Sequence, residues 1–183
     1  MSTLRTIDSE ISSLAPTEQG MVRGSLLSFE DFALNSVVAR GGFCTVYRGV
    51  MLRGARAGES CAVKAISDNA ELLRNNESTM RGLVREVVTL TVVTHPNIVS
   101  VLGYCWTPLV CLVMEFCPNG TLADLLGTKG LDLTWGAPLL GFATQAAEAI
   151  AHLHGLDITH RDIKVSHTQS TAITMPCSTR APP

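Results

Sequence analysis

Short segments of apolar and β-branched residues alternate with glycine, proline and charged residues over most of the first 117 positions. Residues of these types suit a pleated surface, so each segment predicts a strand. The expected strands cover 32–34 with 37–38, 45–47, 61–66, 98–104 and 109–116. Turns containing glycine or proline separate them at 40–42, 53–58 and 107–108. The pattern predicts five strands that begin as an antiparallel meander.

In two places the apolar residues recur every three or four positions instead. This spacing matches the period of a helix, which is about 3.6 residues. The first place predicts a helix over 78–91 with the apolar stripe Met80, Leu83, Val84, Val87 and Leu90. The second predicts a helix over 139–154, opened by Pro138 and closed by Gly155. Its apolar stripe comprises Leu139, Phe142, Ala143, Ala146, Ile150 and Leu153.

A short helix and two irregular ends complete the prediction. Thr121 is expected to cap the short helix, with Asp124 as its acidic partner three residues later. Residues 1–27 are rich in Ser, Thr and Gly with weak periodicity, so we expect a mobile leader. The stretch 165–183 has no period and ends in prolines, so we expect it to be disordered. Five strands with one inserted helix, followed by helices, predict an α+β fold.

Composition narrows the classes of function. Hydrophobic residues make up 46% and charged residues 16% of the chain, and the formal net charge is -2, as expected for a globular protein. The absence of a basic run argues against nucleic-acid binding. No apolar stretch approaches the roughly 20 residues of a membrane span, and no export signal opens the chain. We therefore expect a cytoplasmic protein with reduced cysteines, and the cysteine spacing predicts no metal site.

Three short constellations carry potential chemistry. The glycine turn 40–42 could bring backbone N–H groups close to a polyphosphate, although such a turn also suits a plain hairpin. Lys64 on an apolar strand needs a partner if it is buried, and Glu86 is the candidate; a surface Lys and a surface Glu are the alternative. Asp162 could accept a hydroxyl proton beside Lys164, or the two could belong to a solvated loop.

In this order, these segments resemble the signature of the eukaryotic protein kinase family. Residues 41–49 resemble the phosphate-covering loop of the family, and 62–64 resemble its lysine strand. Glu86 matches the family's helix glutamate, and 95–99 match the segment that follows that helix. Residues 112–122 resemble the hinge between the lobes, and 151–154 with 160–164 resemble the approach to the catalytic loop and the loop itself. The resemblance extends over 29–164. It implies a kinase-like N-lobe over 28–117 and a truncated helical C-lobe over 118–164, of Ser/Thr type with a tyrosine-kinase-like or plant receptor-like character.

The resemblance also implies a site for ATP, with magnesium expected for the family. Lys64, paired with Glu86, would hold the α- and β-phosphates, and Asp162 would be the catalytic base with Lys164 beside it and His160 supporting the loop. Val46 and Ala62 would cover the adenine, Met114 would gate the back pocket, and the backbone of Glu115 and Cys117 would bond the adenine edge. The full nucleotide-binding set is Ala39, Gly41, Gly42, Phe43, Val46, Ala62, Lys64, Glu86, Met114, Glu115 and Cys117.

The chain also departs from the family pattern. Ala39 and Cys44 replace glycines of the loop, which predicts weaker nucleotide binding because each adds a Cβ. His167 stands where the family has a metal-binding Asn, and no Asp-Phe-Gly follows in the 183 residues, which predicts a catalytically inactive chain.

Three interpretations of these departures remain open. The chain could be an incomplete Ser/Thr protein kinase, a pseudokinase-like module that binds a nucleotide or a protein partner, or a gene fragment. Codons for Lys164-Val-Ser can read as an exon end, so 165–183 is hypothesised to be translated intron, which transcript sequencing tests. Because later helices are missing, we expect the stripe of the helix 139–154 to be exposed and to attract a partner.

Overall fold

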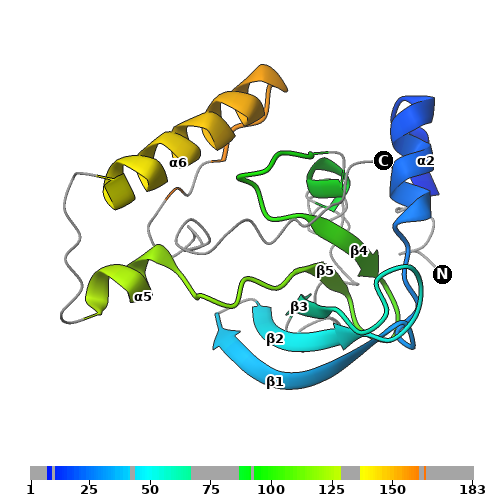
Figure 1. Ribbon diagram of the computed structural model, residues 1–183. Coiled ribbons are helices and arrows are strands. Elements are labelled where there is room, and N and C mark those ends of the chain that lie inside the picture. Colours follow the sequence, from blue (N-terminus) through cyan, green and yellow to red (C-terminus); the bar gives the residue numbers. More distant parts are fainter. Residues whose placement is uncertain are drawn as a thin grey trace. The chain divides into compact units, whose positions relative to one another are not determined.

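The computed structural model describes residues 8–9, 11–41, 44–66, 87–91, 93–128, 137–160 and 163 (Figure 1). The chain divides into two compact units. The N-terminal unit comprises Met1–Thr94 and Ser100–Phe116, and the C-terminal unit comprises His95–Val99 and Cys117–Pro183.

A five-stranded antiparallel sheet forms the centre of the N-terminal unit, as the sequence predicts. Its strands are β1 (Phe32–Arg40), β2 (Cys44–Met51), β3 (Ser60–Ile66), β4 (Val101–Cys105) and β5 (Cys111–Glu115), and their spatial order is β1-β2-β3-β5-β4. The predicted turn at Thr107-Pro108 joins β4 to β5 through a cis peptide bond. Figure 1 shows β1 and β2 curving beside β3.

The register of the strands places one residue of each strand in a row across the sheet. Consecutive pairs along this row are cross-strand partners, and its members are Ala39, Val46, Lys64, Leu112 and Tyr104. Since partners share a face and alternate residues point the same way, Ala62 and Met114 lie on the face of this row. We call it the Lys64 face.

Each face of the sheet carries its own core. The cluster on the Lys64 face consists of Ile11, Val22, Val87, Val88, Tyr104, Trp106, Val110 and Leu112. The cluster on the opposite face consists of Phe32, Met51, Cys61, Val63, Ala65, Cys105, Cys111 and Val113. Along β3, buried residues on the opposite face alternate with half-buried residues on the Lys64 face. The first three residues of β5 are buried, and its last two are half-buried.

The N-terminal segment has more structure than its composition predicts. Helix α2 (Pro16–Gly24) lies within the expected leader, and its Val22 is only 1% exposed. Three apolar positions, Ile11, Leu14 and Val22, pack in or against the Lys64-face cluster, but they are too widely separated by polar residues to stand out in the sequence. The sequence therefore did not reveal the helix over Pro16–Gly24, while the mobility of the leader and the domain boundary at 27 stay predictions.

The helix expected over 78–91 falls mostly outside the described residues. Its described part, 87–91, is helical, with Val87 and Val88 buried.

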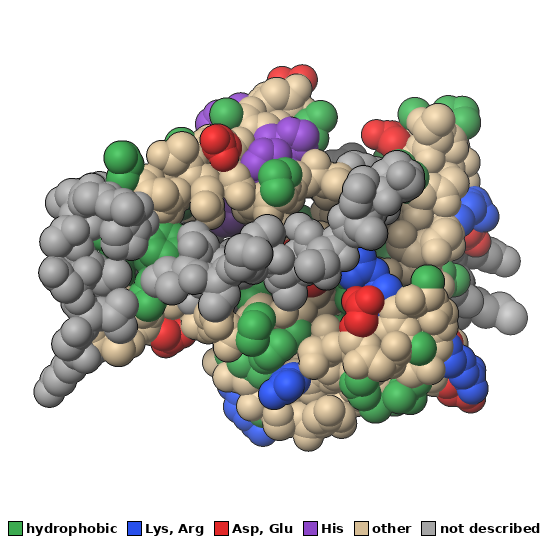
Figure 2. All heavy atoms as spheres, viewed as in Figure 1, with side chains coloured by type: hydrophobic (Ala, Val, Ile, Leu, Met, Phe, Trp, Pro, Cys, Tyr) green, Lys and Arg blue, Asp and Glu red, His purple; other side chains and the backbone are tan. Residues whose placement is uncertain are grey.

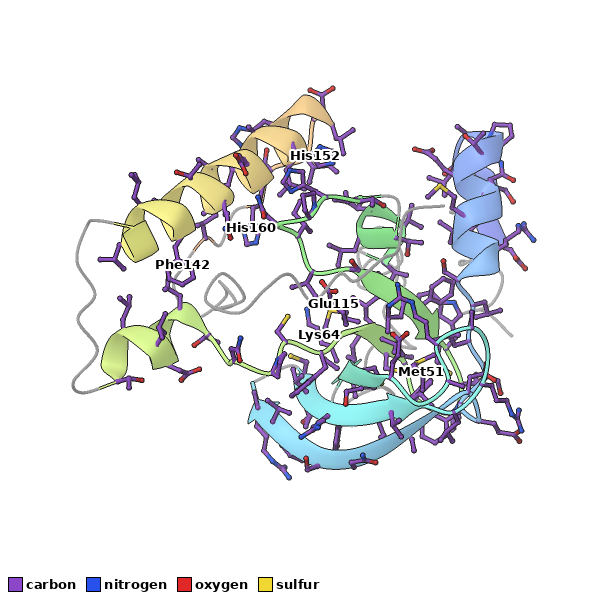
Figure 3. All side chains as sticks on the ribbon, viewed as in Figure 1. Met51, Lys64, Glu115, Phe142, His152 and His160 are labelled. Atoms are coloured by element: carbon purple, nitrogen blue, oxygen red, sulfur yellow. The ribbon has the colours of Figure 1, made fainter. Side chains whose placement is uncertain are left out.

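The C-terminal unit contains two described helices, α5 (Leu122–Gly127) and α6 (Ala137–Gly155). Thr121 is the N-cap of α5, as predicted, and α6 ends at Gly155, as predicted. The expected exposure of the α6 stripe is wrong for Phe142, which is 5% exposed and points toward α5 (Figure 3). No helix among the described residues has the length and apolar character that crossing a membrane requires.

Candidate functional site

The Lys64 face gathers four of the side chains that the sequence singles out for nucleotide binding. Val46 is the cross-strand partner of Lys64, and Ala62 is the partner of Met114. All four are half-buried. Sequence spacing alone cannot show this convergence, because the four residues come from three strands up to 68 positions apart.

Lys64 lies in the middle of β3, between the buried residues Val63 and Ala65, which belong to the opposite face. Its partners in the neighbouring strands, Val46 and Leu112, are apolar. An ammonium held among apolar side chains attracts an anionic group, because its charge is poorly hydrated there. The proposed partner Glu86 lies outside the described residues, so the Lys64–Glu86 pair stays a prediction.

The glycine turn between β1 and β2 is closed by a backbone hydrogen bond from the Gly41 N–H to the Cys44 carbonyl, 2.8 Å long. Gly42 and Phe43 lie outside the described residues. Ala39 and Cys44 both have strand backbone, and Asp157 is the one non-glycine residue with positive φ in the described part of the chain. A Cβ at Ala39 or Cys44 therefore strains no backbone, and the predicted weakening of nucleotide binding can act only through crowding of a ligand.

The end of β5 is tied to the start of β4 on both sides of Glu115. The Glu115 N–H donates to the Ser100 carbonyl at 3.0 Å, and the Ser100 N–H donates to Glu115 Oε1 at 2.9 Å. The N–H of Glu115 and one of its two carboxylate oxygens are therefore engaged within the sheet. The predicted hydrogen bond from the Glu115 backbone to the adenine edge stays a prediction. Met114, the predicted gate residue, packs against the Lys64-face cluster.

Cys117 begins the second stretch of the C-terminal unit and is half-buried. Its predicted contact with the adenine edge stays a prediction.

The turn after α6 leads into the predicted catalytic loop. The Ile158 N–H donates to the Leu153 carbonyl at 2.9 Å, and Asp157 adopts a left-handed φ of 57° that reverses the chain. His160 follows and is exposed. Asp162 and Lys164 lie outside the described residues, so their catalytic roles and the supporting role of His160 stay predictions.

One cluster in the C-terminal unit has no counterpart in the sequence analysis. The rings of His95 and His152 stack with centroids 4.9 Å apart, and Asn97 Nδ2 donates to Glu148 Oε2 at 2.9 Å. Figure 2 shows histidine side chains gathered near the C-terminal half of α6. The sequence matched 95–99 to the family, but nothing local reveals a contact that spans more than 50 positions.

Comparison with known proteins places this geometry in a family. The model of the family "Protein tyrosine and serine/threonine kinase" matches residues 32–167. The chain belongs to the protein kinase family. The matched region begins at the first residue of β1 and includes all five strands, α5 and α6.

Relatives of this kinase-family chain include proteins from distant organisms. It is 37% identical over 140 residues to a probable serine/threonine-protein kinase roco5 of Dictyostelium discoideum. It is 35% identical over 145 residues to a leaf rust 10 disease-resistance locus receptor-like protein kinase-like 1.1 of Arabidopsis thaliana. It is 31% identical over 142 residues to the human mitogen-activated protein kinase kinase kinase 7. Each match covers 75% of this chain but only 5%, 21% and 21% of the respective relative.

Proposed function

We propose that this chain is the nucleotide-holding part of a protein kinase domain and binds ATP on the Lys64 face. The observation that carries the proposal is the register of the sheet. It puts a half-buried cation, Lys64, in one row with the apolar Val46 and beside the Ala62–Met114 pair. The cation suits the negatively charged phosphates of a nucleoside triphosphate, and the apolar residues suit its flat base.

Each of these side chains has a distinct task in this proposal. The Lys64 ammonium donates charge-assisted hydrogen bonds to phosphate oxygens, which are stronger in apolar surroundings than in water. Val46 and Ala62 cover one flat face of the adenine. The carbonyl of Glu115 accepts a hydrogen bond from the amino group at the edge of the adenine. Gly41 allows the β1–β2 turn to lie close to the phosphates. When bound, ATP supplies the γ-phosphoryl group that kinases transfer.

The magnesium chemistry of the family does not fit the residues of this chain. Magnesium prefers oxygen ligands, but His167 stands at the expected Asn position and no Asp-Phe-Gly occurs in the 183 residues. We therefore derive no metal-assisted transfer of the γ-phosphoryl group for these 183 residues. We expect the chain to bind ATP without phosphorylating a substrate.

The chain spans about a fifth or less of the three relatives named above. For a longer protein that contains these residues and the missing metal ligands, we propose phosphorylation of Ser or Thr in a protein substrate, with Asp162 as the base that accepts the hydroxyl proton. The name of the Dictyostelium discoideum relative, a probable serine/threonine-protein kinase, supports the Ser/Thr type. A cytoplasmic location and a tyrosine-kinase-like character are parts of the same proposal.

The test measures nucleotide binding by the 183-residue chain and by its Lys64→Met variant. Binding is detected as a change in thermal unfolding when ATP is added. A ligand that binds the folded state raises its stability, by about 2.7 kcal/mol at one hundred times Kd. Loss of hydrogen bonds to a charged partner corresponds to about 1.5–3 kcal/mol, so Lys64→Met should weaken binding roughly tenfold or more.

Arg53→Met is the matched control. Arg53 is an exposed cation paired with Glu30 at 3.0 Å, and its loss should leave nucleotide binding unchanged. Equal affinities of wild type and Lys64→Met, or no stabilisation by millimolar ATP, would contradict the proposal. Phosphate transfer to a generic substrate that depends on Asp162 would contradict the expected inactivity of this chain.

A further inference from the structure

The N-terminal segment, residues 11–27, is attached to the outer edge of the sheet at β4. Leu26 forms a parallel bridge with Tyr104, the Leu27 N–H donates to the Tyr104 carbonyl at 2.8 Å, and the Tyr104 N–H donates to the Ser25 carbonyl at 3.0 Å. The segment therefore pairs through one isolated bridge with an edge that would otherwise expose unpaired backbone groups.

Gly103 is the residue that permits this close approach. A Cβ at Gly103 would lie 2.6 Å from the Leu27 side chain and 2.6 Å from the Ser25 carbonyl oxygen. No side chain larger than a hydrogen atom fits there without moving the N-terminal segment. Leu27 packs against the cluster on the opposite face, so the segment covers the β4 edge from both sides.

On the Lys64 face, the side chain of Tyr104 links β4 to α2. The Tyr104 hydroxyl, fully buried, donates to the Val22 carbonyl at 2.8 Å. Tyr104 is also the last member of the row that contains Leu112 and Lys64. One side chain thus joins the N-terminal segment to the row that carries the nucleotide-binding lysine.

The same segment shares a buried apolar cluster with the helical residues 87–91. Ile11 and Val22 share one buried cluster with Val87 and Val88, and Leu90 packs against that cluster. Val87 directly follows Glu86, the predicted partner of Lys64. The buried cluster that contains Val87 and Val88 thus includes two side chains from outside the region matched to the kinase family, which begins at residue 32.

We propose that residues 11–27 are a positioning element for the nucleotide site, with Val22 of this segment and its hydrogen-bond partner Tyr104 of β4 as the positioning residues. By packing on Val87 and Val88, they hold 87–91 at the position over the sheet that Lys64 requires. The proposal rests on the proposed ATP binding for its consequence, but the packing itself can be tested without a nucleotide.

The experiment compares full-length wild type with Val22→Ala and Tyr104→Phe, both of which keep the side chain apolar and small enough to fit. Amide hydrogen exchange is followed in peptides that contain 87–91, and ATP affinity is measured well below the unfolding temperature. We expect exchange in these peptides to accelerate roughly tenfold in Val22→Ala, because two buried methyl groups that hold 87–91 are lost. ATP affinity should fall about fivefold or more, and Tyr104→Phe should act in the same direction.

Met51→Ala is the matched control, because Met51 is 4% exposed and belongs to the cluster on the opposite face (Figure 3). It lowers the stability of the same unit but should change neither exchange in 87–91 nor ATP affinity beyond its effect on global unfolding. Val22→Ile keeps a branched side chain at this position, so hydrogen exchange in 87–91 and ATP affinity should both stay at their wild-type values.

The outcomes separate this proposal from the one on which it rests. Unchanged exchange in 87–91, or the same acceleration in Met51→Ala, overturns the positioning role whatever the affinity for ATP. Accelerated exchange with unchanged ATP affinity overturns the link to the nucleotide site. Accelerated exchange in a chain whose wild type binds no ATP supports the packing role and overturns the proposed function instead.

Discussion

At the scale of single residues, the two faces of the central strands impose opposite requirements. Lys64 must keep a charge among apolar neighbours, while Cys61, Cys105 and Cys111 on the other face fill space without charge. Burial raises the pKa of all three thiols, and that of Cys111 to about 12. They therefore stay protonated near neutral pH and act as small apolar residues, since the thiolate is the reactive form.

This burial predicts a loss of stability in alkaline solution. Because folding raises the pKa of Cys111 from 9.0 to about 12, its contribution is fully present below pH 9 and disappears as the pH rises toward 12. One pKa unit corresponds to about 1.4 kcal/mol, so the effect has an upper bound on the order of 4 kcal/mol. Denaturant unfolding as a function of pH should show a shallower alkaline loss in Cys111→Ala than in wild type.

Cys44→Ala, which removes a half-buried thiol, serves as the control for this titration. Parallel pH profiles for wild type and Cys111→Ala would mean that the thiol of Cys111 does not titrate with unfolding.

At the scale of elements, the short helix α5 depends on its cap. Asp124 N–H donates to Thr121 Oγ1 at 3.2 Å, and Thr121 N–H and Oγ1–H donate to Asp124 Oδ2 at 2.8 and 2.7 Å. Six residues are too few for a helix to persist on propensity alone, so these reciprocal bonds and packing must supply its stability. The hydrogen bonds from Thr121 lower the pKa of Asp124.

Thr121→Ala should therefore destabilise α5 by about 1 kcal/mol. NMR titration should show the pKa of Asp124 moving up toward its ordinary value in the variant. Because the folded-state pKa is the lower one, the advantage of the wild type is present above the unfolded pKa and is lost as the pH falls through the folded value. Thr121→Ser keeps the hydroxyl and should retain the low pKa of Asp124. A wild-type-like pKa in Thr121→Ala would contradict the role of the cap.

At the scale of the whole molecule, we expect the two compact units to respond to different changes. Gly49 in β2 is buried, and a Cβ there would collide with the Ala33 carbonyl and lie 3.1 Å from the Cys61 sulfur. Gly141 in α6 has no atom within 4 Å of the corresponding position. The same substitution should therefore have opposite effects in the two units.

Gly49→Ala should destabilise the N-terminal unit by about 1–3 kcal/mol through overpacking. Gly141→Ala should stabilise the C-terminal unit by about 1 kcal/mol, because alanine favours a helix interior over glycine. Since each change acts on its own unit, the free energies in the double variant should add within about 0.5 kcal/mol. Chemical denaturation of the four proteins measures this additivity, and a larger coupling term would show that the stabilities of the two units are not independent.

The sequence by itself determined the strands, the capped helix α5, the helix α6 and membership of the kinase family. These features depend on local periods and on motifs in a set order, which can be read along the chain. The row from Ala39 to Tyr104 needed the tertiary structure, because the register between β3 and β5 joins residues nearly 50 positions apart.

The burial of Phe142 and the helix over Pro16–Gly24 were also decided only by tertiary packing. The N-terminal segment has scattered apolar residues and a polar composition, so no local pattern distinguishes it from an irregular leader. Its structure follows from an edge strand with unpaired backbone groups, a glycine that allows close approach, and a buried tyrosine hydroxyl that needs an acceptor. These are properties of the partner surface, and the segment acquires its structure by satisfying them.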